Sequence, residues 1–125
     1  VMKALESASG GEVFVPKIPS MRVVDVARAI EPDCTFREIG IRPGEKMHET
    51  LISEEDMRNV KIFEDSYVCI PSFCRRRDLI DKYKNLESVP ENFVYRSDKN
   101  DNWISTEKMR DMIGNLYDLS EYRAV

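Results

Sequence analysis

Residues 10–20 read GGEVFVPKIPS and predict a glycine turn, a short strand and the approach to a helix. Apolar residues fill positions 13–15 consecutively, which suits a strand covered on both faces, as in a parallel sheet. Pro16 closes this strand because it has no N–H to donate to a neighbouring strand. Upstream, apolar residues recur at helical spacing over residues 1–9, and Gly10-Gly11 follows where a helix C-terminal glycine belongs. A helix, a glycine turn and a buried strand in succession predict an α/β fold.

Four further segments have helical patterns, and together with residues 1–9 we expect about four to five helices. They are residues 21–30, 54–59, about 76–85 and 105–113. Their expected N-caps are Ser20, Ser53 and Ser105, and Gly114 is expected to end the last helix. The first of the four should bury an apolar stripe made of Val23, Val26, Ala27 and Ile30.

Short strands complete the predicted architecture. Residues 60–62 and 67–70 are expected to pair as a hairpin. Residues 34–41 are expected to run extended into a turn at Arg42-Pro43-Gly44. The last residues, 119–125, are expected to fray.

The composition indicates one compact domain. The chain has 125 residues, of which 42% are hydrophobic and 34% are charged, and 19 basic against 23 acidic residues give a net charge of −4. No run of about 18 apolar residues and no leader peptide is present, so we expect a soluble, cytoplasmic protein without a membrane partner. The negative charge argues against nucleic acid as a partner, because phosphate backbones need clustered basic residues. The short run Arg75-Arg76-Arg77 is expected to be a solvated helix start or surface loop.

Common catalytic and metal-binding motifs are missing or lie in the wrong context. The single His48 lacks further ligands at zinc spacing, so we predict no metal site and a structural role for it. Tyr95 and Lys99 have the spacing of the catalytic pair of short-chain dehydrogenases, but that pair needs a helix, and residues 98–102 break one. We therefore predict no catalytic residue in the chain. The cysteines contain no Cys-x-x-Cys and are expected to be buried or idle thiols: Cys34, Cys69 and Cys74.

The tetrapeptide Arg42-Pro43-Gly44-Glu45 is the strongest candidate for a binding site. The guanidinium of Arg42 offers a rigid fork of donors that matches phosphate oxygens, and the proline-glycine turn would hold it in one orientation. The carboxylate of Glu45 can accept hydroxyl hydrogens of a sugar. Together these groups suit a nucleotide-sugar, while an ion pair between Arg42 and Glu45 on the surface is the alternative.

Three longer strings carry a resemblance to a known family. They are GGEVFVPKIPSM at 10–21, IGIRPGEKMHE at 39–49 and NDNWIS at 100–105. In this order they resemble the C-terminal part of the inverting UDP-N-acetylglucosamine 4,6-dehydratases, which belong to the extended short-chain dehydrogenase/reductase superfamily. The resemblance extends from about Val1 to Ile113, and Met47 replaces the more usual leucine.

The resemblance implies an enzyme that uses NADP to remove water from UDP-N-acetylglucosamine. The sugar is oxidised at carbon 4, water is eliminated across carbons 5 and 6, and hydride returns to carbon 6 with inversion at carbon 5. The product would serve pseudaminic acid, capsule or O-antigen synthesis. By the same resemblance, Arg42 binds the diphosphate of the substrate and Glu45 a hydroxyl of its nucleotide part. The family's NADP fingerprint and catalytic residues lie upstream of Val1, so we expect this chain alone to lack both and to be inactive.

The resemblance also implies a division of the chain. Residues 1–16 would end the cofactor-sheet domain, 17–113 would form the substrate-side region, and 114–125 would be a tail, all within one C-terminal substrate-binding portion of an α/β enzyme. Two other functions stay open, namely a non-catalytic nucleotide-sugar-binding module and an oligomerisation module. Because enzymes of the family are oligomers, we expect a homo-oligomer.

Overall fold

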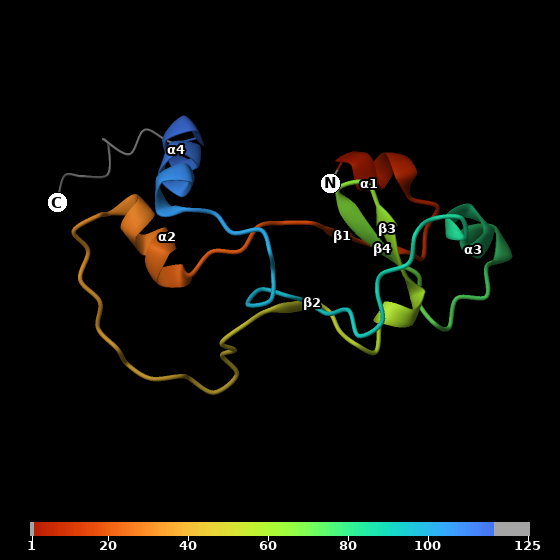
Figure 1. Cartoon of the computed structure of the whole chain (residues 1–125), viewed down its shortest axis with the longest axis horizontal. Coiled ribbons are helices and arrows are strands. Elements are labelled where there is room, and N and C mark those ends of the chain that lie inside the picture. Colours follow the sequence, from red (N-terminus) through yellow and green to blue (C-terminus); the bar gives the residue numbers. More distant parts are fainter. Residues whose placement is uncertain (1, 117–125) are drawn as a thin grey trace. The chain divides into compact units, whose positions relative to one another are not determined.

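The computed structural model describes residues 2–116, and these residues confirm the α/β fold (Figure 1). In chain order, the elements are α1 (Met2–Ser7), β1 (Val13–Pro16), α2 (Val23–Ile30), β2 (Thr50–Ile52), a 3-10 helix (Met57–Asn59), β3 (Val60–Phe63), β4 (Ser66–Cys69), α3 (Arg77–Tyr83), β5 (Tyr95–Arg96) and α4 (Thr106–Leu116). They divide into two compact units, the first with residues 2–18 and 49–99 and the second with 19–48 and 100–116. None of the described helices is long and apolar enough to cross a membrane.

The first unit contains a three-stranded sheet in the order β1-β4-β3. The predicted hairpin is confirmed, since β3 and β4 pair antiparallel with Ile62 opposite Tyr67. The parallel sheet expected for residues 13–15 is wrong, because β1 pairs antiparallel with β4, with Phe14 opposite Val68. The apolar run has another cause, which is that both faces of this antiparallel sheet are covered by apolar groups.

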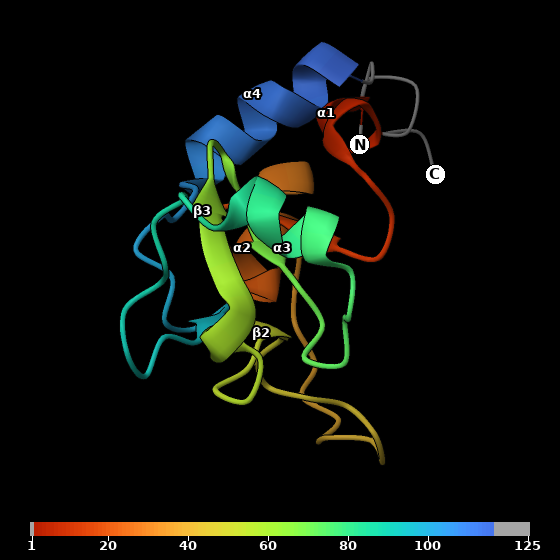
Figure 2. The ribbon, with the colours of Figure 1, turned by 90° about the vertical axis from the view of Figure 1, so that its right-hand side faces the viewer.

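Two clusters of buried residues cover the two sides of this sheet. Side chains alternate between faces along a strand, so Val15 joins one cluster and Phe14 packs against the other. The first cluster contains Val15, Ile52, Val60, Val89 and Tyr95. The second contains Val68, Leu79 and Tyr83. Leu79 and Tyr83 lie on α3, which is drawn in front of the sheet in Figure 2. Phe14, Phe63 and Tyr83 meet edge to face, with ring centroids 5.8–6.5 Å apart.

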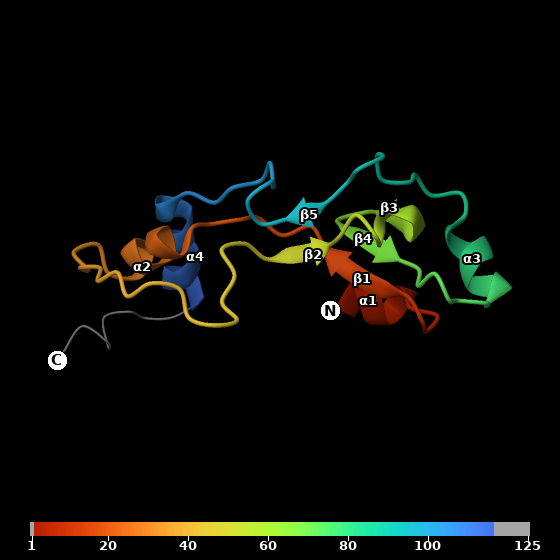
Figure 3. The ribbon, with the colours of Figure 1, turned by 90° about the horizontal axis from the view of Figure 1, so that it is seen from below.

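Strands β2 and β5 form a separate antiparallel pair within the first unit, visible side by side in Figure 3. Backbone hydrogen bonds extend the pairing, because the N–H of Ser97 donates to the carbonyl of Glu49 over 2.9 Å. The hydroxyl of Tyr95 lies 2.7 Å from both the backbone N–H and the carbonyl of Ile18. This side chain therefore ties the end of the 10–20 segment to β5.

Several predicted helix limits change in the structure. The helix expected over 54–59 is only the 3-10 turn Met57–Asn59. The Asp56 carboxylate accepts the Ser53 N–H over 3.2 Å, as in a capping box, but the Ser53 hydroxyl donates to that carboxylate over 2.6 Å instead of accepting a backbone N–H. Helix α4 continues through Gly114 to Leu116, so Gly114 does not end it. The predicted cap of α4 is confirmed, since the N–H of Lys108 donates to Ser105 Oγ over 3.2 Å. Residues 119–125 lie outside the described residues.

The second unit is built on α2 and α4. Ser20 does not cap α2, because it is buried in a bridge to Trp103 and accepts a hydrogen bond from Asn100 over 3.1 Å. The predicted apolar stripe is wrong at both ends, since Val23 and Ile30 are exposed while Ala29 is fully buried.

Residues 34–41 form no strand. Their apolar side chains are exposed, namely Phe36, Ile39 and Ile41. An extended backbone becomes a strand only when a second strand pairs with it, and the structure places none beside this segment within residues 2–116.

Candidate functional site

The sequence Arg42-Pro43-Gly44-Glu45 forms a closed turn in the second unit, which confirms the predicted turn. The N–H of Glu45 donates to the carbonyl of Arg42 over 3.1 Å. In the opposite direction, the N–H of Arg42 donates to Oε2 of Glu45 over 2.9 Å. Gly44 has φ +87°, a conformation that residues with a side chain rarely adopt. The turn is thus held by a backbone bond, by a side-chain bond and by the glycine conformation.

The guanidinium of Arg42 is exposed, and it forms no ion pair or hydrogen bond with any residue in the described part of the chain. The alternative of a surface ion pair between Arg42 and Glu45 is therefore not realised here, because the Glu45 carboxylate bonds to the backbone instead. All five N–H donors of the guanidinium remain available to an anion. This is the chemistry that a diphosphate needs, and the roles of Arg42 and Glu45 toward a substrate stay predictions.

The segment before this turn is attached to α2. The guanidinium of Arg28 lies over the ring of Phe36, with its central carbon 5.3 Å from the ring centroid. Asp25 in turn lies 3.6 Å from Arg28 and 2.7 Å from Arg22. Two of the four arginines between residues 22 and 42 are thus paired with a carboxylate, whereas Arg42 is not.

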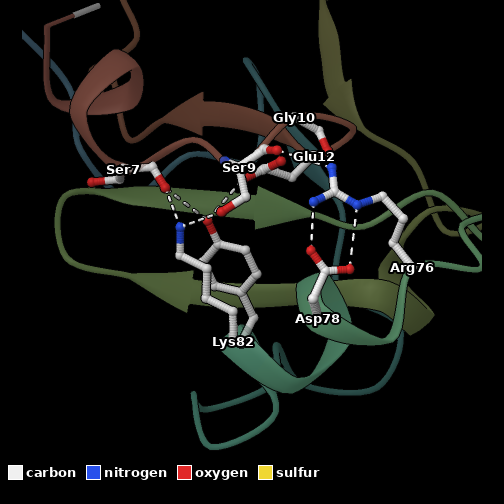
Figure 4. A network of polar contacts seen from close by, with 8 residues as sticks. Ser7, Ser9, Gly10, Glu12, Arg76, Asp78 and Lys82 are labelled. Atoms are coloured by element: carbon white, nitrogen blue, oxygen red, sulfur yellow. Dashed lines mark hydrogen bonds and ion pairs between the residues drawn. The ribbon is translucent and has the colours of Figure 1, made fainter.

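A second polar cluster, which the sequence did not predict, joins α3 to the glycine turn of the first unit (Figure 4). Tyr83 donates its hydroxyl hydrogen to Oε1 of Glu12 over 3.0 Å, and the N–H of Ser9 donates to the same oxygen over 2.6 Å. Lys82 donates to the carbonyl of Ser7 and to Oγ of Ser9. Tyr83 and Glu12 are 71 positions apart, so no local spacing could reveal this cluster.

Arginine 76 belongs to the same cluster. Its guanidinium donates to the carbonyls of Ser9 and Gly10 over 2.9 and 2.7 Å, and it is paired with Asp78 at 2.5 Å. The run 75–77 is exposed at the start of α3, as predicted, but Arg76 is also bonded to the glycine turn. The sequence could not show this, because the two carbonyls belong to a distant turn.

The pKa values in this cluster reflect its hydrogen bonds. Burial alone would raise the pKa of Glu12, but the N–H groups of Ser9 and Glu12, the Tyr83 hydroxyl and the charge of Lys82 together hold it below its usual value. Burial and the hydrogen bond to the Glu12 carboxylate raise the pKa of Tyr83 to about 12. Glu12 is thus held as a carboxylate and Tyr83 as a neutral phenol. Oε1 of Glu12 accepts both hydrogen bonds, whereas its buried Oε2 has no hydrogen-bond partner among the described residues. The other donors and acceptors serve one another, so we assign the cluster a structural role.

A groove of about 710 Å³ lies between α1 and the sheet of the first unit. Leu5, Phe14 and Phe63 contribute to its lining. Charged side chains of this groove are bonded within the protein, as Lys3 is paired with Asp65 at 3.0 Å and Lys17 donates to the carbonyl of Glu64. We therefore assign no ligand to this groove.

The other sequence candidates do not form active or metal-binding sites. Tyr95 lies on β5 rather than on a helix, and its hydroxyl is bonded to Ile18, so it forms no catalytic pair with Lys99. Among the described residues, no group of three or more histidine, cysteine or carboxylate side chains could hold a metal. His48 is exposed, and its structural role stays a prediction. The cysteines are free and half-buried, and burial together with the charge of Asp56 raises the pKa of Cys69.

The described residues do not fit NADP. A dinucleotide site needs a strand, a glycine-rich turn and then a helix, so that the helix N-terminus faces the phosphates. Here Gly10-Gly11 leads from α1 into β1, which is the reverse order.

Comparison with known proteins places this geometry in a family. The inverting UDP-N-acetylglucosamine 4,6-dehydratase of Campylobacter jejuni is 36% identical over 122 residues, covering 90% of this chain and 35% of the enzyme. The UDP-glucose 4-epimerase of Rickettsia canadensis is 35% identical over 71 residues, covering 54% of this chain and 21% of that enzyme. The X-ray structure of Pen from Bacillus thuringiensis is similar with a TM-score of 0.71 and 28% identity, covering 94% of this chain and 35% of that one.

These relatives confirm the resemblance to the dehydratases that the sequence suggested, while the chain spans about a third of the dehydratase's length. Residues 1–71 also match the family described as polysaccharide biosynthesis protein. That match covers more than half of the 125 residues and includes the Arg42-Glu45 turn. The chain therefore belongs to the polysaccharide biosynthesis protein family.

Proposed function

We propose that this chain is the substrate-binding portion of an NADP-dependent UDP-N-acetylglucosamine 4,6-dehydratase of the inverting type. In this proposal Arg42 binds the diphosphate of the UDP-sugar, and Glu45 accepts a hydroxyl hydrogen of its nucleotide part. The family and the Campylobacter relative support the substrate class. The reaction itself would depend on residues outside this chain, so the chain alone binds and does not catalyse.

The observation that carries the proposal is the exposed, unpaired guanidinium on a closed turn. An arginine in a preformed position binds a phosphate with less loss of conformational entropy than one on a mobile chain. Its charge also complements an anion, whereas the chain as a whole has a net charge of −4. Attraction for a diphosphate would therefore come from Arg42 rather than from a general positive field.

The complete protein would act in nucleotide-sugar synthesis for a surface glycan such as pseudaminic acid, capsule or O-antigen. NADP would bind in the part of the relatives that this chain does not span, and the substrate and product would be cytoplasmic. A non-catalytic nucleotide-sugar-binding module is the second candidate, and the same Arg42 turn would serve it.

The test is a titration of the isotope-labelled chain with UDP, followed by NMR. We expect the Arg42 amide and guanidinium signals to shift, with a dissociation constant in the millimolar range. Arg42→Ala should weaken binding roughly tenfold or more, since hydrogen bonds to charged groups contribute about 1.5–3 kcal/mol. Arg37→Ala removes an exposed arginine from the same segment and should leave binding unchanged.

Two results would overturn the proposed site. One is the absence of any shift at millimolar UDP. The other is an equal loss of affinity in Arg42→Ala and Arg37→Ala, which would show that only the general charge matters.

A further inference from the structure

The carboxylate of Glu45 is already engaged within the turn. Its Oε2 accepts the backbone N–H of Arg42 over 2.9 Å. Arg42 is also the residue whose guanidinium is proposed to bind the phosphate. The backbone bond from Glu45 N–H to the Arg42 carbonyl closes the same ring from the other side. The backbone of Arg42 is therefore bonded on both its N–H and its carbonyl by one residue.

We propose that Glu45 is a positioning residue, which holds the backbone of Arg42 so that its guanidinium points toward the diphosphate of the ligand. This inference rests on the proposed function, and it gives Glu45 a second task beside direct contact with a ligand hydroxyl, because the turn engages only its Oε2. The two hydrogen bonds leave few backbone conformations to Arg42, because the φ and ψ angles of Arg42 lie between its bonded N–H and its bonded carbonyl. A side chain on a fixed backbone has fewer rotamers to lose when it binds.

The geometry also explains why this arginine stays unpaired. A glutamate three residues away would normally pair with the guanidinium, as Asp25 does with Arg22 and Arg28 elsewhere in this unit. The backbone N–H of Arg42 competes for the same carboxylate and is bonded to it instead. Glu45 thus fixes Arg42 without neutralising it, which leaves the positive charge to the ligand.

Two neutral variants separate positioning from charge. Glu45→Gln keeps an oxygen that can accept the Arg42 N–H, whereas Glu45→Ala does not. Both remove one negative charge, so both relieve the same repulsion of an anion. Their difference therefore measures the hydrogen bond alone. Glu38→Gln and Glu38→Ala make the matched control, because Glu38 is an exposed carboxylate of the same segment with no contact that would hold the turn.

The probe that distinguishes positioning from direct contact is inorganic pyrophosphate, which has no ribose or sugar hydroxyl. If Glu45 positions Arg42, Glu45→Ala should bind pyrophosphate and UDP about three- to tenfold more weakly than Glu45→Gln, the effect of one lost hydrogen bond. If Glu45 instead contacts a hydroxyl, the two variants should bind pyrophosphate equally and differ only for UDP. That second pattern would overturn the positioning role and leave the Arg42 site intact.

The amide signal of Arg42 gives a readout that does not depend on ligand binding. Its proton shift should be preserved in Glu45→Gln and should move upfield in Glu45→Ala, because a hydrogen-bonded amide proton is deshielded. An unchanged Arg42 amide in Glu45→Ala would overturn the positioning role even if no ligand bound. A failure of the wild-type chain to bind either UDP or pyrophosphate, with the amide shift as expected, would count against the proposed function alone.

Discussion

The carboxylate of Glu12 joins the glycine turn of the first unit to α3 through hydrogen bonds. It accepts from Ser9 and Tyr83, and its pKa lies below the usual value. A carboxylate with a depressed pKa contributes stability above its unfolded pKa of about 4.3, and this contribution is lost as the pH falls through the folded value. The chain should therefore lose stability between about pH 5 and pH 3, in part through Glu12.

This prediction is checked with Glu12→Gln in urea denaturation at several pH values. The free energy of unfolding of the variant should be lower than that of wild type at pH 7. This difference should shrink toward pH 3, where the wild-type carboxyl becomes protonated and so is neutral, as the glutamine is. Glu6→Gln replaces an exposed carboxylate on α1 and should follow the wild-type curve. A constant gap at all pH values would show that the charge of Glu12 does not contribute.

Tyr83 supplies the alkaline counterpart of this effect. Its pKa is raised to about 12, so its contribution is complete below the unfolded value near 10 and is lost as the pH rises from about 10 to about 12. Tyr83→Phe removes the ionisable group and should remove this part of the alkaline loss.

Helix α4 is attached to α2 by a polar contact at the helix end. Arg110 donates to the carbonyls of Arg28 and Ala29 over 3.1 and 3.3 Å. The last carbonyls of a helix have no partner within the helix, and a positive charge there also complements the helix dipole. Arg110 therefore acts as a C-terminal cap that a different helix provides.

Arg110→Ala should lower the free energy of unfolding by about 1–2 kcal/mol, since two charge-assisted hydrogen bonds are lost at a largely exposed position. Arg110→Lys should recover part of the lost free energy of unfolding, because an ammonium is also positive but cannot donate to both carbonyls in the geometry of the guanidinium. Lys108→Ala on the same helix is the control. Hydrogen exchange should locate the effect in the last turn of α2, and an effect spread evenly over the chain would contradict a capping role.

Across the molecule, many large apolar side chains are exposed. They include Met2, Leu5, Val23, Ile41, Met47 and Phe73, each more than half exposed. Helix α1 buries none of its described residues, so little apolar contact holds it. Exposed apolar side chains in such number are typical of surfaces that contact other protein.

We therefore expect the chain to associate at micromolar to millimolar concentration. Size-exclusion chromatography with light scattering should give a mass that rises with concentration above 14.5 kDa. Phe73→Asp, at the most exposed aromatic residue of the described chain, should reduce the association if that surface takes part. A constant monomer mass would contradict the expected homo-oligomer.

Local patterns in the sequence determined much of the fold and the turn of the candidate site. The hairpin of β3 and β4, the helix α3 with buried Leu79 and Tyr83, and the cap at Ser105 depend on neighbouring residues, which the sequence displays directly. The turn at Arg42 was predictable for the same reason, because proline and glycine restrict or permit backbone angles whatever surrounds them.

The sequence by itself determined the α/β class, the hairpin and the closed turn, since each follows from spacing within a few residues. Only the tertiary structure decided the antiparallel pairing of β1, the burial of Ala29 in place of Val23, and the bonds from Arg76 and Tyr83 to the glycine turn. The apolar pattern of a strand indicates that both of its faces are covered, but it does not indicate whether the neighbouring strand pairs with it in the parallel or the antiparallel direction. Likewise, a charged side chain can be solvated or bonded with the same local sequence, because its partner is set by the folded chain.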